Sequence, residues 1–232
     1  MKKVIVISLG GSLIVPGDIE IDFLKKFKEV VLKNMNKYKF VVVCGGGKVA
    51  RTYINGLKNG GESRFFQSLV GIAVTRLNAR FMTYLFGKEA NEGIPQDMKH
   101  VEFLLNKNEI VFCGALRYAP NETSDGTSAK LANFFNADFI NLTDVQGLYS
   151  KNPKKHRDAK FIPKISWKDF LKMANKEKFS PGQHFVLDQS AAKIILEKKV
   201  KTYILGKDMK NFDDFLKGKK FKGTMIGGED LN

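Results

Sequence analysis

The chain has 232 residues, of which 43% are hydrophobic and 27% are charged, the balance of an ordinary globular protein with a sizeable core. No apolar run approaches the ~18 residues of a transmembrane helix, which excludes a membrane-spanning protein. The apolar run at residues 4–7 is shorter than the core of a signal peptide and has no cleavage site, so we expect a cytoplasmic protein.

The chain is strongly basic, with 39 Lys and Arg against 24 Asp and Glu and a net charge of +15. Such a charge attracts polyanions. Nucleic-acid-binding proteins usually add a clustered basic stripe or a base-reading motif, and the sequence has no zinc-finger spacing, no RNP motif and no evident helix-turn-helix. We therefore expect a solvated lysine-rich surface, suited to phosphorylated ligands, rather than a nucleic-acid partner.

Cysteine and histidine give no sign of a metal site. Cys44 and Cys113 each follow an apolar strand-like run, so we expect two buried free thiols. The three histidines, His100, His156 and His184, lack the spacing of a metal-binding pair or a catalytic triad.

Strand-like and helix-like segments alternate along the chain. Short apolar runs predict strands at 4–7, 40–43, 109–112, 139–142, 202–205 and 224–226. Helical spacing of apolar residues predicts helices at 20–36, 48–59, 66–88, 124–136, 166–175, 188–198 and 210–217. We expect Ser124 or Asp125 to cap the fourth of these helices, and residues 150–163 to form a basic loop. The alternation predicts an α/β fold with a mostly parallel sheet, helices on both faces and one globular unit with two lobes.

Two glycine-rich loops follow the first two predicted strands. The first is Ser8-Leu9-Gly10-Gly11-Ser12, and the second is Gly45-Gly46-Gly47-Lys48 with Arg51 one turn further on. Glycines let backbone amides approach phosphate oxygens, and a guanidinium beside a helix start adds charge. Either loop alone could be only a tight turn. Neither matches the Walker P-loop or the Rossmann fingerprint.

Three further segments carry polar residues near helix starts or strand ends. Residues 120–125 could hold an anion at a helix start, with Asp125 either capping the helix or organising cationic side chains. Residues 143–149 could cradle a base and ribose, or form an ordinary turn. Lys193 stands one turn into a helix that starts near Asp188, where it could reach a transferring phosphoryl group.

Six segments in order resemble the amino acid kinase family, and within it the archaeal uridylate kinase branch. They are SLGGSL, VVVCGGGKVARTYI, VGIAVTRLNA, TSDGTSAKLANFFNADFINLTDVQGLY, SPGQHFVLDQSAAKII and KTYILG. The resemblance implies a three-layer α/β/α sandwich, with an acceptor lobe at about 1–136 and an ATP lobe at about 137–232. It also implies phosphoryl transfer from ATP to UMP with Mg²⁺, and a hexamer built from dimers.

The resemblance also assigns site residues. It implies catalytic roles for Lys193, Asp125 and Arg51. It implies ATP contacts by Gly11, Ser12, Gly47, Arg51, Thr143, Asp144, Tyr149 and Asn152. It implies UMP contacts by Gly46, Ser68, Tyr118, Ala119, Pro120, Asn121, Glu122, Thr123 and Ser124. No protein ligand for a metal is implied.

The chain departs from the family pattern mainly on the acceptor side. Ser68 and Asn121-Glu122 replace an aspartate and Gly-His of the family, and Gln146 and Asn152 replace aspartates near the donor. The alternatives are a related kinase with another small phosphate or carboxylate acceptor, and a non-catalytic nucleotide-binding regulator. An isopentenyl phosphate kinase is disfavoured, because the histidine expected after the second glycine-rich loop is absent.

Overall fold

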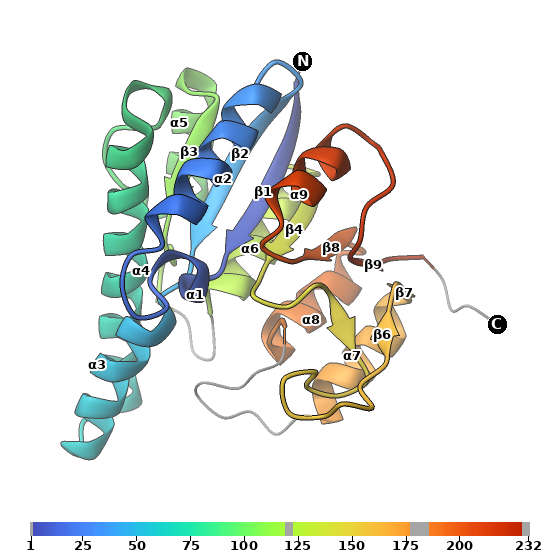
Figure 1. Cartoon of the computed structure of the whole chain (residues 1–232). Helices are drawn as coiled ribbons and strands as arrows, with labels where there is room; N and C mark the ends of the chain where they lie inside the picture. The colour runs from blue at the N-terminus through green and yellow to red at the C-terminus, as the bar shows by residue number, and fades with distance from the viewer. Residues whose placement is uncertain (1, 119–122, 177–185, 229–232) are drawn as a thin grey trace.

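The protein, a computed structural model described over residues 2–118, 123–176 and 186–228, is built on one large twisted sheet (Figure 1). The sheet has seven strands in the order β3-β2-β1-β4-β8-β9-β7. Their bounds are β1 Lys3–Leu9, β2 Tyr38–Cys44, β3 Ile110–Cys113, β4 Asp138–Leu142, β7 Lys164–Ile165, β8 Thr202–Leu205 and β9 Thr224–Ile226.

The sheet is mostly parallel, as the sequence predicts. At its centre Ile7 of β1 pairs with Val42 of β2 on one side and with Ile140 of β4 on the other, both in parallel. Only β9 runs antiparallel to its neighbour β8 among the pairs of this sheet in the described chain. The carboxyl ends of β1, β2, β3 and β4 therefore share one edge, where ligands bind in folds of this kind.

Helices cover both faces of the sheet, which makes a three-layer α/β/α sandwich (Figure 1). One face is covered by α1 Gly11–Ile14, α2 Ile21–Asn34, α4 Arg64–Phe86 and α9 Met209–Leu216. The other face is covered by α5 Met98–Lys107, α6 Ser124–Phe134, α7 Trp167–Lys176 and α8 Gln189–Glu197. Alternate residues of each strand serve the two layers: Val6 packs in one core, and Ile5 and Ile7 pack in the other.

The helix α3 Gly47–Asn59 lies beside α4 at one side of the molecule, away from α7 and α8 (Figure 1). The two helices approach closely at Gly71, where a Cβ atom would lie 3.2 Å from Cδ1 of Ile54. Of the thirteen residues of α3 only Ala50 is buried. Among the described residues, no helix has the length and apolar character to cross a membrane.

The predicted strands and helices are confirmed, and the structure adds short elements that the sequence pattern did not indicate. These are α1, α5, the single-turn helix Gly87–Glu89, β7, and an antiparallel pair formed by β5 Leu148–Tyr149 and β6 Phe161–Ile162. The four residues of α1 are too few to show a helical period, and two-residue strands form only through their partners. The start of α5 had a local signal, since Asp97 caps it by accepting a hydrogen bond from His100 N at 2.9 Å.

The predicted cap of α6 is wrong. Thr123 is the capping residue, and its hydroxyl accepts a hydrogen bond from Gly126 N at 3.2 Å. Ser124 and Asp125 lie inside the first turn of the helix. Because Thr123 satisfies the helix amide, the Asp125 carboxyl is left to interact elsewhere. The two thiols, by contrast, are buried and free as expected.

Candidate active site

A cavity of about 980 Å³ opens at the carboxyl edge of the sheet. It is lined by both glycine-rich loops, by the first turn of α6 and by the segment that follows β4. The cavity therefore gathers segments that lie more than a hundred residues apart in the sequence. Parallel strands make this possible, since they deliver their following loops to the same edge.

The two glycine-rich loops stack backbone against backbone on one wall. A Cβ atom on Gly11 would lie 2.1 Å from Gly47 N, and one on Gly47 would lie 2.6 Å from Gly11 C. Gly47 also has a φ of +60°, a conformation that other residues rarely adopt. Only glycine fits both positions. The contact brings the amino end of α3 to the cavity, with Arg51 one turn further along the helix, so positive charge and backbone amides face the same space.

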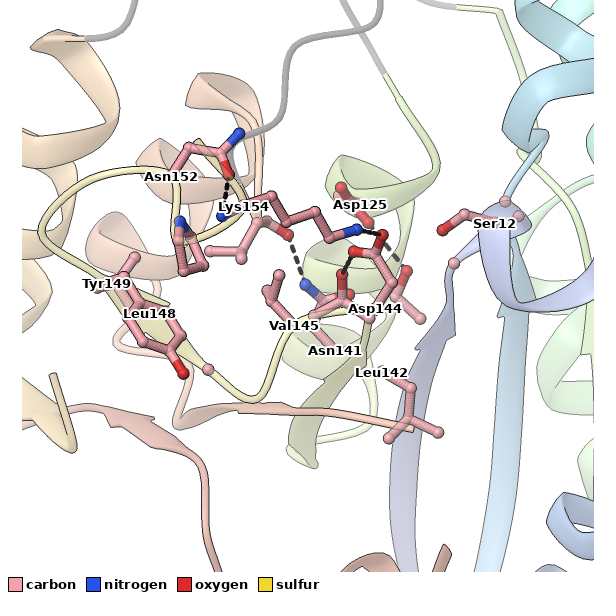
Figure 2. Close-up of a pocket in the computed structure, with 18 of the residues that line it drawn as sticks. Ser12, Asp125, Asn141, Leu142, Asp144, Val145, Leu148, Tyr149, Asn152 and Lys154 are labelled. Carbon is pink, nitrogen blue, oxygen red and sulfur yellow. Dashed lines mark hydrogen bonds and ion pairs between the residues drawn. The ribbon is translucent and has the colours of Figure 1, made fainter. Parts of the chain in front are cut away.

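Asp125 lines the cavity (Figure 2) and has a second carboxylate, Asp188, close by. Its Oδ1 accepts a hydrogen bond from Ser8 Oγ at 2.9 Å. Asp188 lies close by, caps α8 by accepting from Ala191 N at 2.8 Å, and receives a hydrogen bond from the Thr123 hydroxyl. Two effects raise the pKa of Asp125 to about 7: burial away from water, which is the larger, and the negative charge of Asp188. The hydrogen bond from Ser8 acts in the opposite direction and lowers this pKa.

The segment after β4 forms the opposite wall. Figure 2 shows the Lys154 side chain extending to Asp144, with which it forms an ion pair. Asn152 Oδ1 accepts a hydrogen bond from Lys154 N at 2.9 Å, which shapes the turn. The Tyr149 ring packs edge-on against Phe161 at 5.4 Å between centroids, so the β5–β6 pair supports this wall from behind.

The cavity brings together most of the predicted site residues that the structure describes. It is lined by Gly11, Ser12, Gly46, Gly47, Arg51, Ser124, Asp125, Thr143, Asp144, Tyr149 and Asn152. Ala119, Pro120, Asn121 and Glu122, predicted to contact the acceptor, lie outside the described residues.

Three predicted acceptor residues lie outside the cavity lining, although their positions are described. The Ser68 hydroxyl donates to Arg64 O, four residues earlier in α4, at 2.9 Å. Tyr118 packs edge-on against Phe65 at 4.9 Å between ring centroids. Thr123 turns its hydroxyl to α6 and α8, as described above.

Lys193 also stays out of the cavity lining. Its side chain is 70% exposed on α8, and its Nζ lies 3.8 Å from Glu197 Oε1. The structure thus brings Arg51 and Asp125 together at the cavity but not Lys193. The catalytic role of Lys193 stays a prediction.

Sequence reasoning named Ser8 in the first glycine-rich loop but gave it no role, and it missed Asn141 and several cations in the cavity lining. Ser8 and Asn141 are buried near the carboxyl ends of β1 and β4, and Asn141 Nδ2 donates to Val186 O at 2.5 Å. The missed cations include Lys154, Lys155 and Lys176. A polar residue inside an otherwise apolar strand was an available signal for the first two; nothing local distinguishes these lysines from the chain's other lysines.

No group of three or more His, Cys, Asp or Glu side chains in the described part of the chain could hold a metal ion. Mg²⁺ in phosphoryl-transfer sites usually keeps several waters and binds substrate phosphates with few protein ligands. The carboxylates of Asp125 and Asp144 in the cavity lining are oxygen donors of the kind that such an ion accepts.

Together, the parallel sheet, the paired glycine loops and the cations at the carboxyl edge define an α/β protein equipped to bind phosphorylated ligands. The family model for the amino acid kinase family matches residues 3–206, and the chain belongs to this family. The expected family and fold class are thereby confirmed.

Similar proteins span nearly the whole chain. A uridylate kinase from Thermococcus kodakarensis is 35% identical over 224 residues, which cover 96% of this chain and 98% of that protein. The crystal structure of a uridylate kinase from Archaeoglobus fulgidus superimposes with a TM-score of 0.83 at 34% identity, covering 98% of this chain and 100% of that one. A UMP kinase structure from Ureaplasma parvum, 21% identical with a TM-score of 0.80, supports the fold.

Proposed function

We propose that this chain is an ATP-dependent kinase that transfers the γ-phosphoryl group of ATP to UMP, giving ADP and UDP. The observation that carries the proposal is the near-full-length similarity to uridylate kinases, at 34–35% identity over 96% of the chain. The cavity supports it, because its walls combine anion-binding glycine loops with a polar segment suited to a nucleoside.

The donor side of the proposal uses the residues that the cavity gathers. ATP phosphates lie against the amides of Gly11 and Gly47, with Ser12 and Arg51 as further donors. Thr143, Asp144, Tyr149 and Asn152 hold the nucleoside on the opposite wall. We also propose an acceptor lobe at about 1–136, whose two glycine-rich loops reach across to the ATP phosphates, and an ATP lobe at about 137–232.

In the proposed reaction a phosphate oxygen of UMP forms a bond to the γ-phosphorus, and the bond from that phosphorus to the β,γ-bridging oxygen breaks. Such a transfer needs alignment and charge neutralisation more than covalent help. Arg51, the amides of the glycine loops and the amino end of α3 supply fixed positive potential. Mg²⁺ bound with ATP supplies further charge neutralisation.

UMP contacts are proposed for Gly46, Ser68 and residues 118–124. A second candidate, a related kinase with another small phosphate or carboxylate acceptor, is favoured by one observation: the Ser68 hydroxyl is bonded to its own helix. A third candidate is a nucleotide-binding regulator without activity. The lining of the cavity by Arg51 and Asp125 weighs against it.

We further propose a cytoplasmic homo-oligomer assembled from dimers. The exposed residues Phe66, Ala73, Leu77 and Tyr84 lie within about 20° of one line along α4. This stripe is centred on residue 75, the midpoint of the helix, so an antiparallel second copy sets Phe66 against Tyr84 and Ala73 against Leu77. A two-fold interface requires this self-complementarity, which favours a second copy of the chain as the occupant.

The proposed activity is tested by ADP release with ATP and Mg²⁺ over a panel of UMP, CMP, dUMP, AMP, GMP, isopentenyl phosphate, acetylglutamate and carbamate. Turnover confined to UMP supports the proposal. Turnover confined to another acceptor would favour the second candidate. ATP binding by calorimetry without any turnover would favour the regulator.

A further inference from the structure

The segment GIAVTRLNA, residues 71–79, forms the middle of α4, and the proposed function leaves it without a role. Its outer residues Ala73 and Leu77 belong to the exposed stripe. Thr75 and Asn78, on the inner side, are each only 6% exposed. Polar side chains buried this deeply need partners, and theirs lie in two loops rather than in the helix alone.

The first partner is the loop that follows β3. Thr75 Oγ1 accepts a hydrogen bond from Ala115 N at 2.9 Å and donates one to Ile72 O at 2.7 Å. Arg76 Nε donates to Ala115 O at 3.2 Å, and its Nη2 donates to Leu116 O. No carboxylate pairs with Arg76 in the described part of the chain, so backbone carbonyls alone hold its guanidinium.

The second partner is the glycine-rich loop that follows β2. Asn78 Nδ2 donates to Gly45 O at 2.7 Å. Thr75 also borders this loop, since its Cγ2 lies 3.5 Å from the place of a Cβ atom on Gly46. One turn of α4 thus contacts the loops at the ends of two neighbouring paired strands.

The fit between α4 and the loop after β3 is tight. A Cβ atom on Gly114 would lie 2.6 Å from both Arg76 N and Thr75 Oγ1. The loop can therefore lie on the helix only with glycine at this position, and its next residues are held by both side chains. The direction in which the chain continues toward Tyr118 is set by these contacts.

We infer that Thr75 and Arg76 are positioning residues for the acceptor, and that Asn78 ties their helix turn to the loop that carries Gly46. The inference rests on the proposed function, because the loops held by this turn lead to Gly46 and to residues 118–124, the proposed UMP contacts. The hydrogen bonds of the Thr75 hydroxyl join Ala115 N and Ile72 O, and neither residue is among the proposed ATP contacts. Loss of the Thr75 hydroxyl therefore weakens acceptor binding and spares ATP.

The test compares Thr75→Val, which keeps the shape but removes the hydroxyl, with Thr75→Ser, which keeps the hydroxyl. We expect Thr75→Val to raise the KM for UMP by about tenfold or more, the effect of leaving the Ala115 amide unpaired. The KM for ATP should change by less than about twofold, and Thr75→Ser should stay within about threefold of the wild type in both. If the valine variant does not fold, Arg76→Lys, which keeps the charge but loses the forked geometry, takes its place, with the same expected rise in the KM for UMP.

A second readout does not depend on the acceptor. Amide hydrogen exchange in residues 114–118 should accelerate at least about tenfold in Thr75→Val and remain near wild type in Thr75→Ser. Unchanged exchange, or equal rises in the KM values for UMP and ATP, would overturn the inference. Failure of the proposed function is distinct, since it appears as absent UMP turnover in the wild type; the same comparison is then made with the acceptor that the panel identifies, or with exchange alone.

Discussion

At the scale of single residues, Asp125 shows how the neighbourhood sets the chemistry of a carboxyl. The sequence left two roles open for it, a helix cap or an organiser of cations. Thr123 takes the capping role, and Asp125 instead accepts a hydrogen bond from Ser8 and lies close to Asp188. The Asp125 carboxyl, for which a catalytic role is proposed, therefore ionises near neutral pH.

The raised pKa of Asp125 predicts a pH-dependent stability. Below pH 4 the carboxyl is protonated in the folded and unfolded chains, and its ionisation costs nothing. As the pH rises from about 4 to about 7, the unfolded chain ionises first, so the folded state loses stability. Asp125→Asn removes this loss, and the gain in Tm over the wild type should be larger at pH 8 than at pH 5.

Ser8→Ala is the matched control for this experiment, because the Ser8 hydroxyl favours the ionised form of Asp125. Its removal should raise the folded-state pKa of Asp125 further, so the stability loss should extend to higher pH while still beginning near pH 4. Equal effects of Asp125→Asn on Tm at pH 5 and pH 8 would show that the pKa of Asp125 is not raised.

Two cations give a second prediction at this scale. Arg51 lines the cavity and Lys193 is exposed beside Glu197. We expect Arg51→Ala to lower kcat/KM by about 10- to 100-fold, the range for a lost charge-assisted contact, and Lys193→Ala to lower kcat strongly with little change in fold. Steady-state kinetics on both variants measure these two effects. An unchanged kcat in Lys193→Ala would show that this exposed lysine has no catalytic role.

At the scale of elements, the site depends on contacts between loops that belong to different strands. The sequence identified both glycine-rich loops, but each alone was compatible with an ordinary turn. Their significance comes from the approach of Gly11 to Gly47, where no side chain fits. The β5–β6 pair is a second example, since it forms between segments twelve residues apart and supports Tyr149.

This contact predicts a strong effect for a small substitution. Gly11→Ala places a methyl group 2.1 Å from Gly47 N, so the loops must separate. We expect a loss of about 1–3 kcal/mol in the free energy of unfolding and weaker ATP binding. Gly56→Ala is the control, because nothing lies within 4 Å of its Cβ position in α3. It should stabilise the chain by about 0.5–1 kcal/mol.

Chemical denaturation and calorimetric ATP titration measure these two quantities. If Gly11→Ala binds ATP and unfolds as the wild type does, the close contact between the two loops is not required for the site.

At the scale of the whole molecule, α4 connects the proposed interface with the proposed acceptor site. Its outer stripe is apolar and exposed, with Leu77 at 62% and Tyr84 at 72%, while its inner turn holds two loops. An exposed apolar stripe of this length is unusual for a surface that stays in water. Because α4 would contact the second copy on one side and holds the acceptor loops on the other, dimer formation and the ordering of these loops would be linked.

The proposed dimer gives the prediction at this scale. Leu77→Glu places two carboxylates near the two-fold axis, and sedimentation velocity should show a smaller species than the wild type. Phe103→Glu is the control, because Phe103 is similarly exposed, at 54%, but lies on α5 outside the stripe. It should leave the oligomer unchanged. If the wild type and Leu77→Glu sediment as species of the same size, α4 is not part of the interface.

Much of the fold was predictable because local patterns agree with it. The apolar run at residues 40–43 reflects burial on both faces of the sheet, and the helical spacing across α2 and α4 reflects packing against one of these faces. The glycine-rich loops and the polar residues after β4 were predictable for the same reason: they follow directly on strongly patterned strands. Elements of two to four residues, such as α1 and β7, carry no period of their own.

The sequence by itself determined the fold class, the family and eleven of the residues that line the cavity, because these depend on local pattern and on motifs in fixed order. Only the tertiary structure decided which of them meet. It placed Asp125 next to Ser8 and Asp188, left Lys193 in solvent, and set Thr75 and Arg76 on the loop after β3. The physical reason is that charge and hydrogen bonding act over a few ångströms in space, whatever the separation along the chain.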